Sequence, residues 1–166
     1  MLGHLPSLKQ MAAALLLAAA YLAPSAAKAA DKSRATGFTD IYFGEIGISG
    51  SDITASRDLC IYTNSSSQQY SLLAAGSQSS SDFAITSTAS AIPIDVQWSD
   101  QAGQSSGRTI QPNVTESGFS TNARNQTCNS GPAATASLIL TLRGAELAIA
   151  RAGSYSGWLS ITIAPL

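Results

Sequence analysis

The chain has 166 residues, with nine Lys and Arg against ten Asp and Glu. The basic residues are scattered, so no basic patch indicates binding to a nucleic acid backbone. No charge run or apolar helix-length stretch beyond the N-terminal region indicates a membrane partner, and no Gly-rich phosphate loop is present.

The first residues have the pattern of a secretory signal peptide. Lys9 precedes the apolar run Met11–Ala23 (MAAALLLAAAYLA), and Ala27–Ala29 (AKA) fits an A-x-A cleavage site. The run is shorter than the about 20 apolar residues that span a bilayer, so a signal peptide is favoured over an uncleaved anchor. The expected organisation is a signal peptide at 1–29, a short N-terminal extension at 30–37 and one domain at 38–166.

Cys60 and Cys128 are the two cysteines of the chain, and both lie in the exported part. In an oxidising compartment such a pair favours a disulfide. The alternative is a metal site, which would lack ligands because the one histidine, His4, lies in the signal peptide. By the entropic model, closing this loop would stabilise the fold by about 4 kcal/mol.

From residue 38 onward, short apolar segments alternate with turns rich in Ser, Gly, Asn and Asp. We expect extended segments at Phe38–Ile48, Asp58–Thr63, Tyr70–Ala74, Phe83–Thr86, Ile92–Trp98, Arg108–Gln111, Ala136–Leu142 and Tyr155–Ile163. Residues 112–132 are expected to form a long loop, and Ala145–Arg151 one or two helical turns. Turn signals spaced by about eight to twelve residues, with little helical periodicity, predict an all-β sandwich or barrel.

Two of these segments alternate clearly. Every second residue of Ile92–Trp98 (IPIDVQW) is apolar, and Leu159, Ile161 and Ile163 alternate with Ser and Thr. Both patterns are typical of strands with one buried face. The sequence stops three residues after Ile163, although chain ends are usually poorly held unless something docks them. We therefore expect the function to involve this last strand.

The sequence offers little catalytic chemistry. With His4 removed, no Ser–His or Cys–His pair or histidine proton shuttle can form. A glycosidase pair such as Asp95 with Glu116 stays open but disfavoured, because the carboxylates lie on separate elements. For Trp98 and Trp158, core or interface packing is favoured over a sugar-stacking platform. We expect no enzyme, no cofactor and no metal.

The last residues, "GSYSGWLSITIAPL", resemble the C-terminal strand of subunits assembled by the bacterial chaperone–usher pathway. These subunits have a Gly-x-Tyr turn followed by an alternating strand. "IYFGEI", "CIYTNSSSQQYSLLAAGS" and "IPIDVQW" are similar to exported pilins of the spore coat protein U type and, more loosely, to colonisation-factor fimbrial subunits. The likeness covers about residues 38 to 166.

The resemblance implies an immunoglobulin-like β-sandwich that lacks one strand, with an apolar groove beside its last strand. A periplasmic chaperone would cover this groove, and a strand of the next subunit would fill it in the fibre. By the resemblance, one wall consists of Leu159, Ile161 and Ile163, and the opposite wall of Ile41, Phe43, Ile46 and Ile48. Tyr155 and Gly157 would set the turn into the last strand, and Cys60–Cys128 would tie the second strand to the loop before the penultimate one.

The function implied is a structural subunit of a surface fimbria that supports adhesion or biofilm formation. Its partners would be a periplasmic chaperone, an outer-membrane usher and neighbouring subunits, and it would pass through the periplasm to the cell surface. Ala30–Gly37 (ADKSRATG) lacks the large apolar residues of a donor strand. Either cleavage occurs elsewhere, or part of Phe38–Phe43 donates, or the chain accepts a strand and gives none. The alternatives are a self-complete secreted sandwich that binds a glycan or surface ligand, and a secreted hydrolase.

Overall fold

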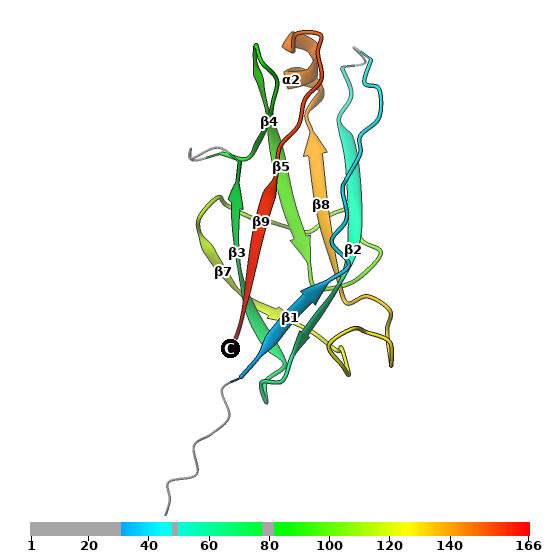
Figure 1. The fold of residues 1–166 in the computed structure, drawn as a ribbon, viewed down its shortest axis with the longest axis vertical. Coiled ribbons are helices and arrows are strands. Elements are labelled where there is room, and N and C mark those ends of the chain that lie inside the picture. The colour runs from blue at the N-terminus through cyan, green and yellow to red at the C-terminus, as the bar shows by residue number, and fades with distance from the viewer. Residues whose placement is uncertain (1–30, 48–49, 78–81) are drawn as a thin grey trace, which may run out of the picture. The chain divides into compact units, whose positions relative to one another are not determined.

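The computed structural model describes residues 31–47, 50–77 and 82–166 (Figure 1). The predicted signal peptide, residues 1–29, lies outside these residues, and so does Ile48. The described unit, Asp31–Leu166, consists mainly of strands. Its strands are β1 (Ser33–Thr36), β2 (Ile53–Thr63), β3 (Gln69–Gly76), β4 (Ala84–Thr86), β5 (Ala91–Ser99), β6 (Arg108–Thr109), β7 (Thr115–Ser120), β8 (Ala136–Leu142) and β9 (Leu159–Pro165). The described helix is α2 (Gly144–Ile149).

The strands form two antiparallel sheets. The larger sheet has the order β1-β2-β8-β5-β4, with β6 also paired to β5, and the smaller sheet has the order β7-β3-β9. Buried residues of both sheets share one hydrophobic cluster, so the sheets pack face to face. The chain is therefore an immunoglobulin-like β-sandwich, which confirms the predicted fold class.

A cluster of aromatic side chains lies at the centre of this core. The indole Nε1 of Trp98 donates a hydrogen bond to the Tyr70 hydroxyl at 3.0 Å, and the Tyr70 ring stacks on Phe119 with centroids 5.6 Å apart. Burial raises the pKa of Tyr70 above its ordinary range. The guanidinium of Arg108 lies 3.7 Å from the Phe119 centroid. Trp98 is thus a core residue, as favoured from the sequence.

The first strand differs from the prediction. The described residues of Phe38–Ile48 form no strand, and β1 (Ser33–Thr36) pairs with β2 instead, within the predicted N-terminal extension. Gly37 and Gly44 have positive φ angles of 93° and 78°. These left-handed conformations interrupt an extended backbone on both sides of the apolar residues between them.

The expected long loop over residues 112–132 is also wrong in part, because it contains β7 (Thr115–Ser120). Along β7 the buried residue is Phe119, and its neighbours are polar or glycine. Gly118, with a φ of 80°, lies where the pairing of β7 with β3 shifts register. A strand with one large apolar residue has no periodic pattern, so the sequence gives no signal for it.

The predicted disulfide is present, with an S–S distance of 2.08 Å between Cys60 and Cys128. It joins β2 to the loop that precedes β8, as the resemblance implied. The two sulfurs pack with Ala123 and Tyr62 in a small cluster separate from the main core. Cys60 alternates along β2 with the core residues Leu59 and Ile61, so the bond lies on the outer face of the larger sheet.

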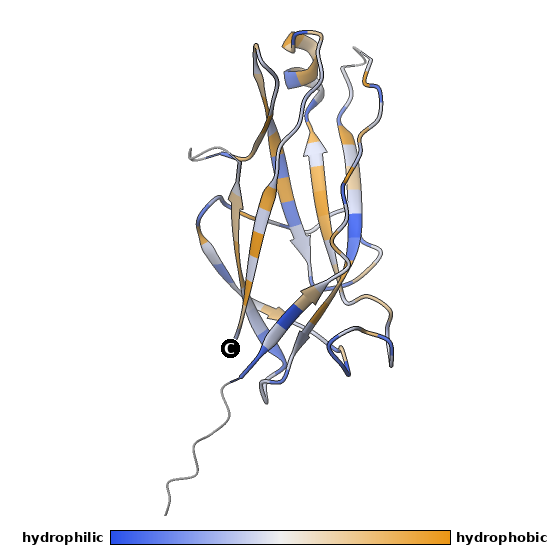
Figure 2. Ribbon diagram, in the orientation of Figure 1, coloured by the Kyte–Doolittle hydropathy of each residue, from blue (hydrophilic) through white to orange (hydrophobic). Residues whose placement is uncertain are grey.

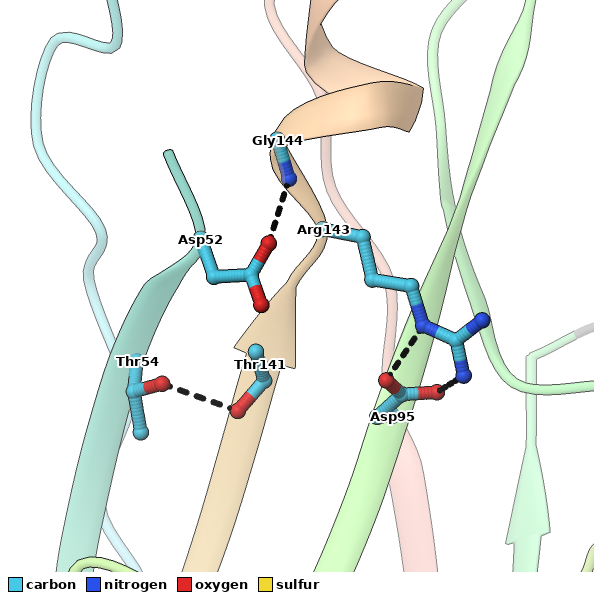
Figure 3. A network of polar contacts seen from close by, with 6 residues as sticks. All are labelled: Asp52, Thr54, Asp95, Thr141, Arg143 and Gly144. Carbon is cyan, nitrogen blue, oxygen red and sulfur yellow. Dashed lines mark hydrogen bonds and ion pairs between the residues drawn. The ribbon is translucent and has the colours of Figure 1, made fainter. Parts of the chain in front are cut away.

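A polar network on the same outer face holds the end of β8 and the start of α2 (Figure 3). Asp52 accepts a hydrogen bond from the Gly144 backbone N–H at 2.8 Å, and the hydroxyls of Thr54 and Thr141 lie 2.9 Å apart. A Cβ on Gly144 would lie 2.2 Å from the carbonyl oxygen of Gly50. These contacts explain why a glycine begins the helix.

Candidate functional site

The distinctive feature of the fold is the outer edge of β9. This strand pairs with β3 on one side, and no strand among the described residues pairs with its other side. The N–H of Leu166 donates to the Gln69 carbonyl of β3 at 3.0 Å. Because backbone groups alternate in direction along a strand, those of Leu159, Ile161 and Ile163 then point away from β3. We call this side of β9 the open edge.

One contact partly covers the open edge. The hydroxyl of Ser33, the first residue of β1, donates to the carbonyl of Ile163 at 2.9 Å. This hydrogen bond agrees with the alternation, because it shows the Ile163 carbonyl directed away from β3. β1 therefore lies against the C-terminal end of β9, and the open edge extends from there toward Leu159.

The inner face of β9 is apolar but incompletely covered. Leu159, Ile161 and Ile163 pack against the main core and are partly buried, while Ser160 and Thr162 are exposed. The alternation of hydrophobic and polar residues along β9 is visible in Figure 2. A strand covered on its inner face would bury these three side chains fully.

The inner face of the larger sheet, which faces the smaller sheet, is also incompletely covered. Leu138, Leu140 and Leu142 share the inner face of β8, which lies between β2 and β5. Leu138 is 5% exposed and Leu142 is fully buried, but Leu140 is only partly buried. An inward leucine on a central strand remains accessible only where the facing sheet does not cover it. The smaller sheet therefore stops short above Leu140.

The residues predicted for the opposite wall divide into two groups. Ile41 is partly buried and packs against the same core as the inner face of β9. Phe43 and Ile46 pack in a neighbouring cluster with Tyr155, and Ile48 lies outside the described residues. We call the partly buried set beside the open edge the apolar strip; it consists of Ile41, Leu140, Leu159, Ile161 and Ile163.

Tyr155 and Gly157 lie in the segment that leads into β9. The Tyr155 hydroxyl donates to the Arg151 carbonyl at 2.7 Å and lies 2.5 Å from the Ser90 hydroxyl. A Cβ on Gly157 would lie 2.9 Å from the carbonyl oxygen of Ala84 in β4. The segment is thus held close to β4, and this contact sets the direction in which β9 begins.

Sequence reasoning missed two inward residues of the larger sheet, Leu140 and Arg57. The alternation within Ala136–Leu142 already places Leu140 inward, but only the fold shows that it is incompletely covered. Arg57 was missed because the predicted strand began at Asp58, whereas β2 begins at Ile53. With the longer strand, Arg57 falls on the same face as Leu59.

The other chemistry weighed from the sequence falls elsewhere. Asp95 lies on β5 and makes an ion pair with Arg143 at 2.5 Å, which raises the pKa of Arg143 (Figure 3). Glu116 lies on β7, in the other sheet. Trp158 is 61% exposed but Trp98 is buried, so the two do not form one stacking surface.

Across the part of the chain that the structure describes, no group of three His, Cys, Asp or Glu residues could hold a metal ion. Within the same residues, no helix has the length and apolar character needed to cross a membrane.

Comparison with known proteins gives a likeness of fold. No family model and no curated protein sequence matches the chain. Among solved structures, the chain is similar to one chain of a structure titled "Chaperone-tip adhesin complex is vital for synergistic activation of CFA/I fimbriae biogenesis". The match has a TM-score of 0.50 and 16% sequence identity, and it covers 81% of this chain but only 41% of the other. At this identity the likeness shows a shared fold.

Proposed function

We propose that this chain is a structural subunit of a bacterial surface fimbria, whose open edge accepts an extended strand from another polypeptide. The observation that carries the proposal is an unpaired edge strand with partly exposed apolar side chains, next to an uncovered leucine on a central strand. The resemblance to chaperone–usher pilins and the likeness to a chain from a fimbrial chaperone–adhesin complex support it.

The physical reason is that one added strand would both pair the free backbone groups of β9 and cover the apolar side chains beside them. The unpaired backbone groups of β9 and the partly exposed apolar strip form a ready template for aggregation. A strand laid along the open edge would pair with those backbone groups, and its alternate side chains would cover the strip. In this proposal a periplasmic chaperone supplies the strand during transit. At the outer-membrane usher a neighbouring subunit replaces it, and the fibre then supports adhesion or biofilm formation.

The pairing of β1 favours an acceptor role. Ser33–Thr36 is hydrogen-bonded to β2 within the same domain, with Thr36 opposite Cys60. Donating this segment to another subunit would require it to leave its own sheet. The proposal therefore assigns the donated strand to another polypeptide.

The first test is to export the protein alone to an oxidising periplasm and measure its oligomeric state and thermal unfolding. We expect degradation, aggregation or a polymer ladder that disappears on boiling, because the apolar strip is only partly covered. A soluble monomer with one cooperative unfolding transition and no affinity for extended peptides would contradict the proposal. That outcome would favour the self-complete sandwich, and binding to glycans would be tested next.

A matched pair of variants tests the open edge itself. Ile161→Asp places a charge on the inner face of β9, and Thr162→Asp places the same charge on its exposed outer face. We expect Ile161→Asp to lose chaperone capture and incorporation into fibres, while Thr162→Asp retains both. Formation of the Cys60–Cys128 disulfide reports whether each variant folds. Normal incorporation of a folded Ile161→Asp variant would refute the proposal.

A further inference from the structure

Arg57 is a partly buried cation on β2, and its guanidinium contact with Asp40 is exposed to solvent. It lies on the inner face of β2, opposite the core residue Leu138 in the strand register. The register also pairs Ala55 with Leu140, so Arg57 is a diagonal neighbour of Leu140 on the same face. A strand that covers Leu140 would therefore pass close to the guanidinium.

The guanidinium is only partly satisfied. One terminal nitrogen donates to the backbone carbonyl of Asp40 at 3.2 Å. Nε is buried and has no hydrogen-bond partner within the described residues. A buried donor without a partner costs about 1–3 kcal/mol, and more when it is charged. Each such group in a native fold calls for an explanation, and a missing partner is one.

The described chain offers no carboxylate to Arg57. Asp40 contacts it through the backbone. The Asp58 side chain accepts from the Gly103 N–H at 2.8 Å and the Ser137 hydroxyl at 2.7 Å, on the outer face of the sheet. The ion pair found among the described residues joins Arg143 to another strand. Arg57 is therefore a cation whose Nε has no hydrogen-bond partner and which makes no ion pair among the described residues.

We propose that the strand accepted at the open edge carries a glutamate or aspartate side chain that pairs with Arg57. This inference rests on the proposed function and specifies the chemistry of the partner. The occupant is a segment whose inward residues are apolar except for one carboxylate. A guanidinium presents a planar set of donors that matches a carboxylate, so the pair adds both affinity and a fixed register. A strand shifted by two residues would place an apolar side chain on the charge.

The test uses synthetic peptides in which valine alternates with threonine, all with the same lysine tail for solubility. In each peptide, glutamate or glutamine replaces one valine, and the position is scanned along the peptide. Binding is measured on the exported chain, purified in denaturant with its disulfide intact and refolded at low concentration, because the free chain is expected to aggregate. The readouts are the fluorescence anisotropy of labelled peptides and the shift in melting temperature. We expect one position at which glutamate binds about tenfold or more tightly than glutamine, as for hydrogen bonds to charged groups.

Two variants assign this preference to Arg57. Arg57→Met should remove the preference for glutamate. Binding of the valine–threonine peptide without a replaced valine should stay the same or become tighter. Arg151→Met makes the same change in net charge at an exposed arginine whose side chain has no hydrogen bond within the described chain, and it should retain the preference.

The outcomes separate the two proposals. If no peptide of the set binds or raises the melting temperature, the proposed function itself fails. If the valine–threonine peptides bind but glutamate is never favoured over glutamine, only the pairing with Arg57 is overturned. A preference that survives in Arg57→Met would also overturn it, because the carboxylate would then be recognised elsewhere.

Discussion

Replacing Leu138 and Leu140 of β8 by alanine, one at a time, tests whether the smaller sheet leaves Leu140 incompletely covered. Leu138 and Leu140 lie on the same face of β8, and Leu138 is 5% exposed whereas Leu140 is only partly buried. Replacing a fully enclosed leucine by alanine leaves a cavity and costs about 3–5 kcal/mol, which we expect for Leu138→Ala. Leu140→Ala leaves no enclosed cavity, so we expect only a transfer cost of about 1–2 kcal/mol.

Strand binding should show the opposite ranking. An occupant of the open edge would complete the burial of Leu140, so Leu140→Ala should weaken binding of a valine–threonine peptide by about fivefold to tenfold. Leu138→Ala should leave peptide binding unchanged, because Leu138 is already buried in the free chain. Urea unfolding and titration with labelled peptide, both on variants refolded at low concentration, provide the two measurements. Equal loss of stability in the two variants, with no change in peptide binding, would refute the reasoning.

Three further predictions concern the scaffold. Gly157→Ala should lower the free energy of unfolding by about 1–2 kcal/mol, because the added Cβ would lie 2.9 Å from the carbonyl oxygen of Ala84. Gly153→Ala should be nearly neutral, because the nearest atom to its Cβ would be 3.9 Å away. Urea unfolding of the two variants compares these effects. Burial raises the pKa of Tyr70, so stability should be intact below about pH 10 and fall above it by about 1.4 kcal/mol per pH unit, as the unfolded chain loses a proton that the folded chain keeps. Alkaline unfolding curves should lack this fall in Tyr70→Phe and retain it in Tyr42→Phe, where the ring is 84% exposed. Reduction of the disulfide should cost about 4 kcal/mol for its separation of 68 residues, measured by urea unfolding with and without reductant.

The sequence predicts strands well where apolar residues alternate. In β5 the expected inward residues Ile92, Val96 and Trp98 are buried and Ile94 is partly buried, and in β9 the alternation gives the inner and outer faces correctly. It fails where pairing depends on the backbone. β1 (Ser33–Thr36) has no large apolar residue, so its pairing with β2, rather than a pattern of side chains, identifies it as a strand.

The site could be predicted only in outline. The three apolar residues of β9 follow from its period of two, but their partial exposure depends on which strands the fold leaves unpaired. Ile41 and Phe43 have the composition of a strand, yet their segment, bounded by glycines with positive φ angles, pairs with no strand among the described residues. Arg57 is one of two charged residues in β2. Its proposed role rests on the absence of an acceptor for its Nε, which a sequence does not show.

The disulfide sets how far the chain can lengthen under tension. It closes residues 61–127 into a loop, about half of the described chain, and β3 through β7 lie within that loop. When the chain is pulled from its two ends, only residues outside the loop can extend, each by at most about 3.6 Å. The partner strand of β9 therefore stays tethered inside the loop, ready for β9 to pair with it again when the force is released.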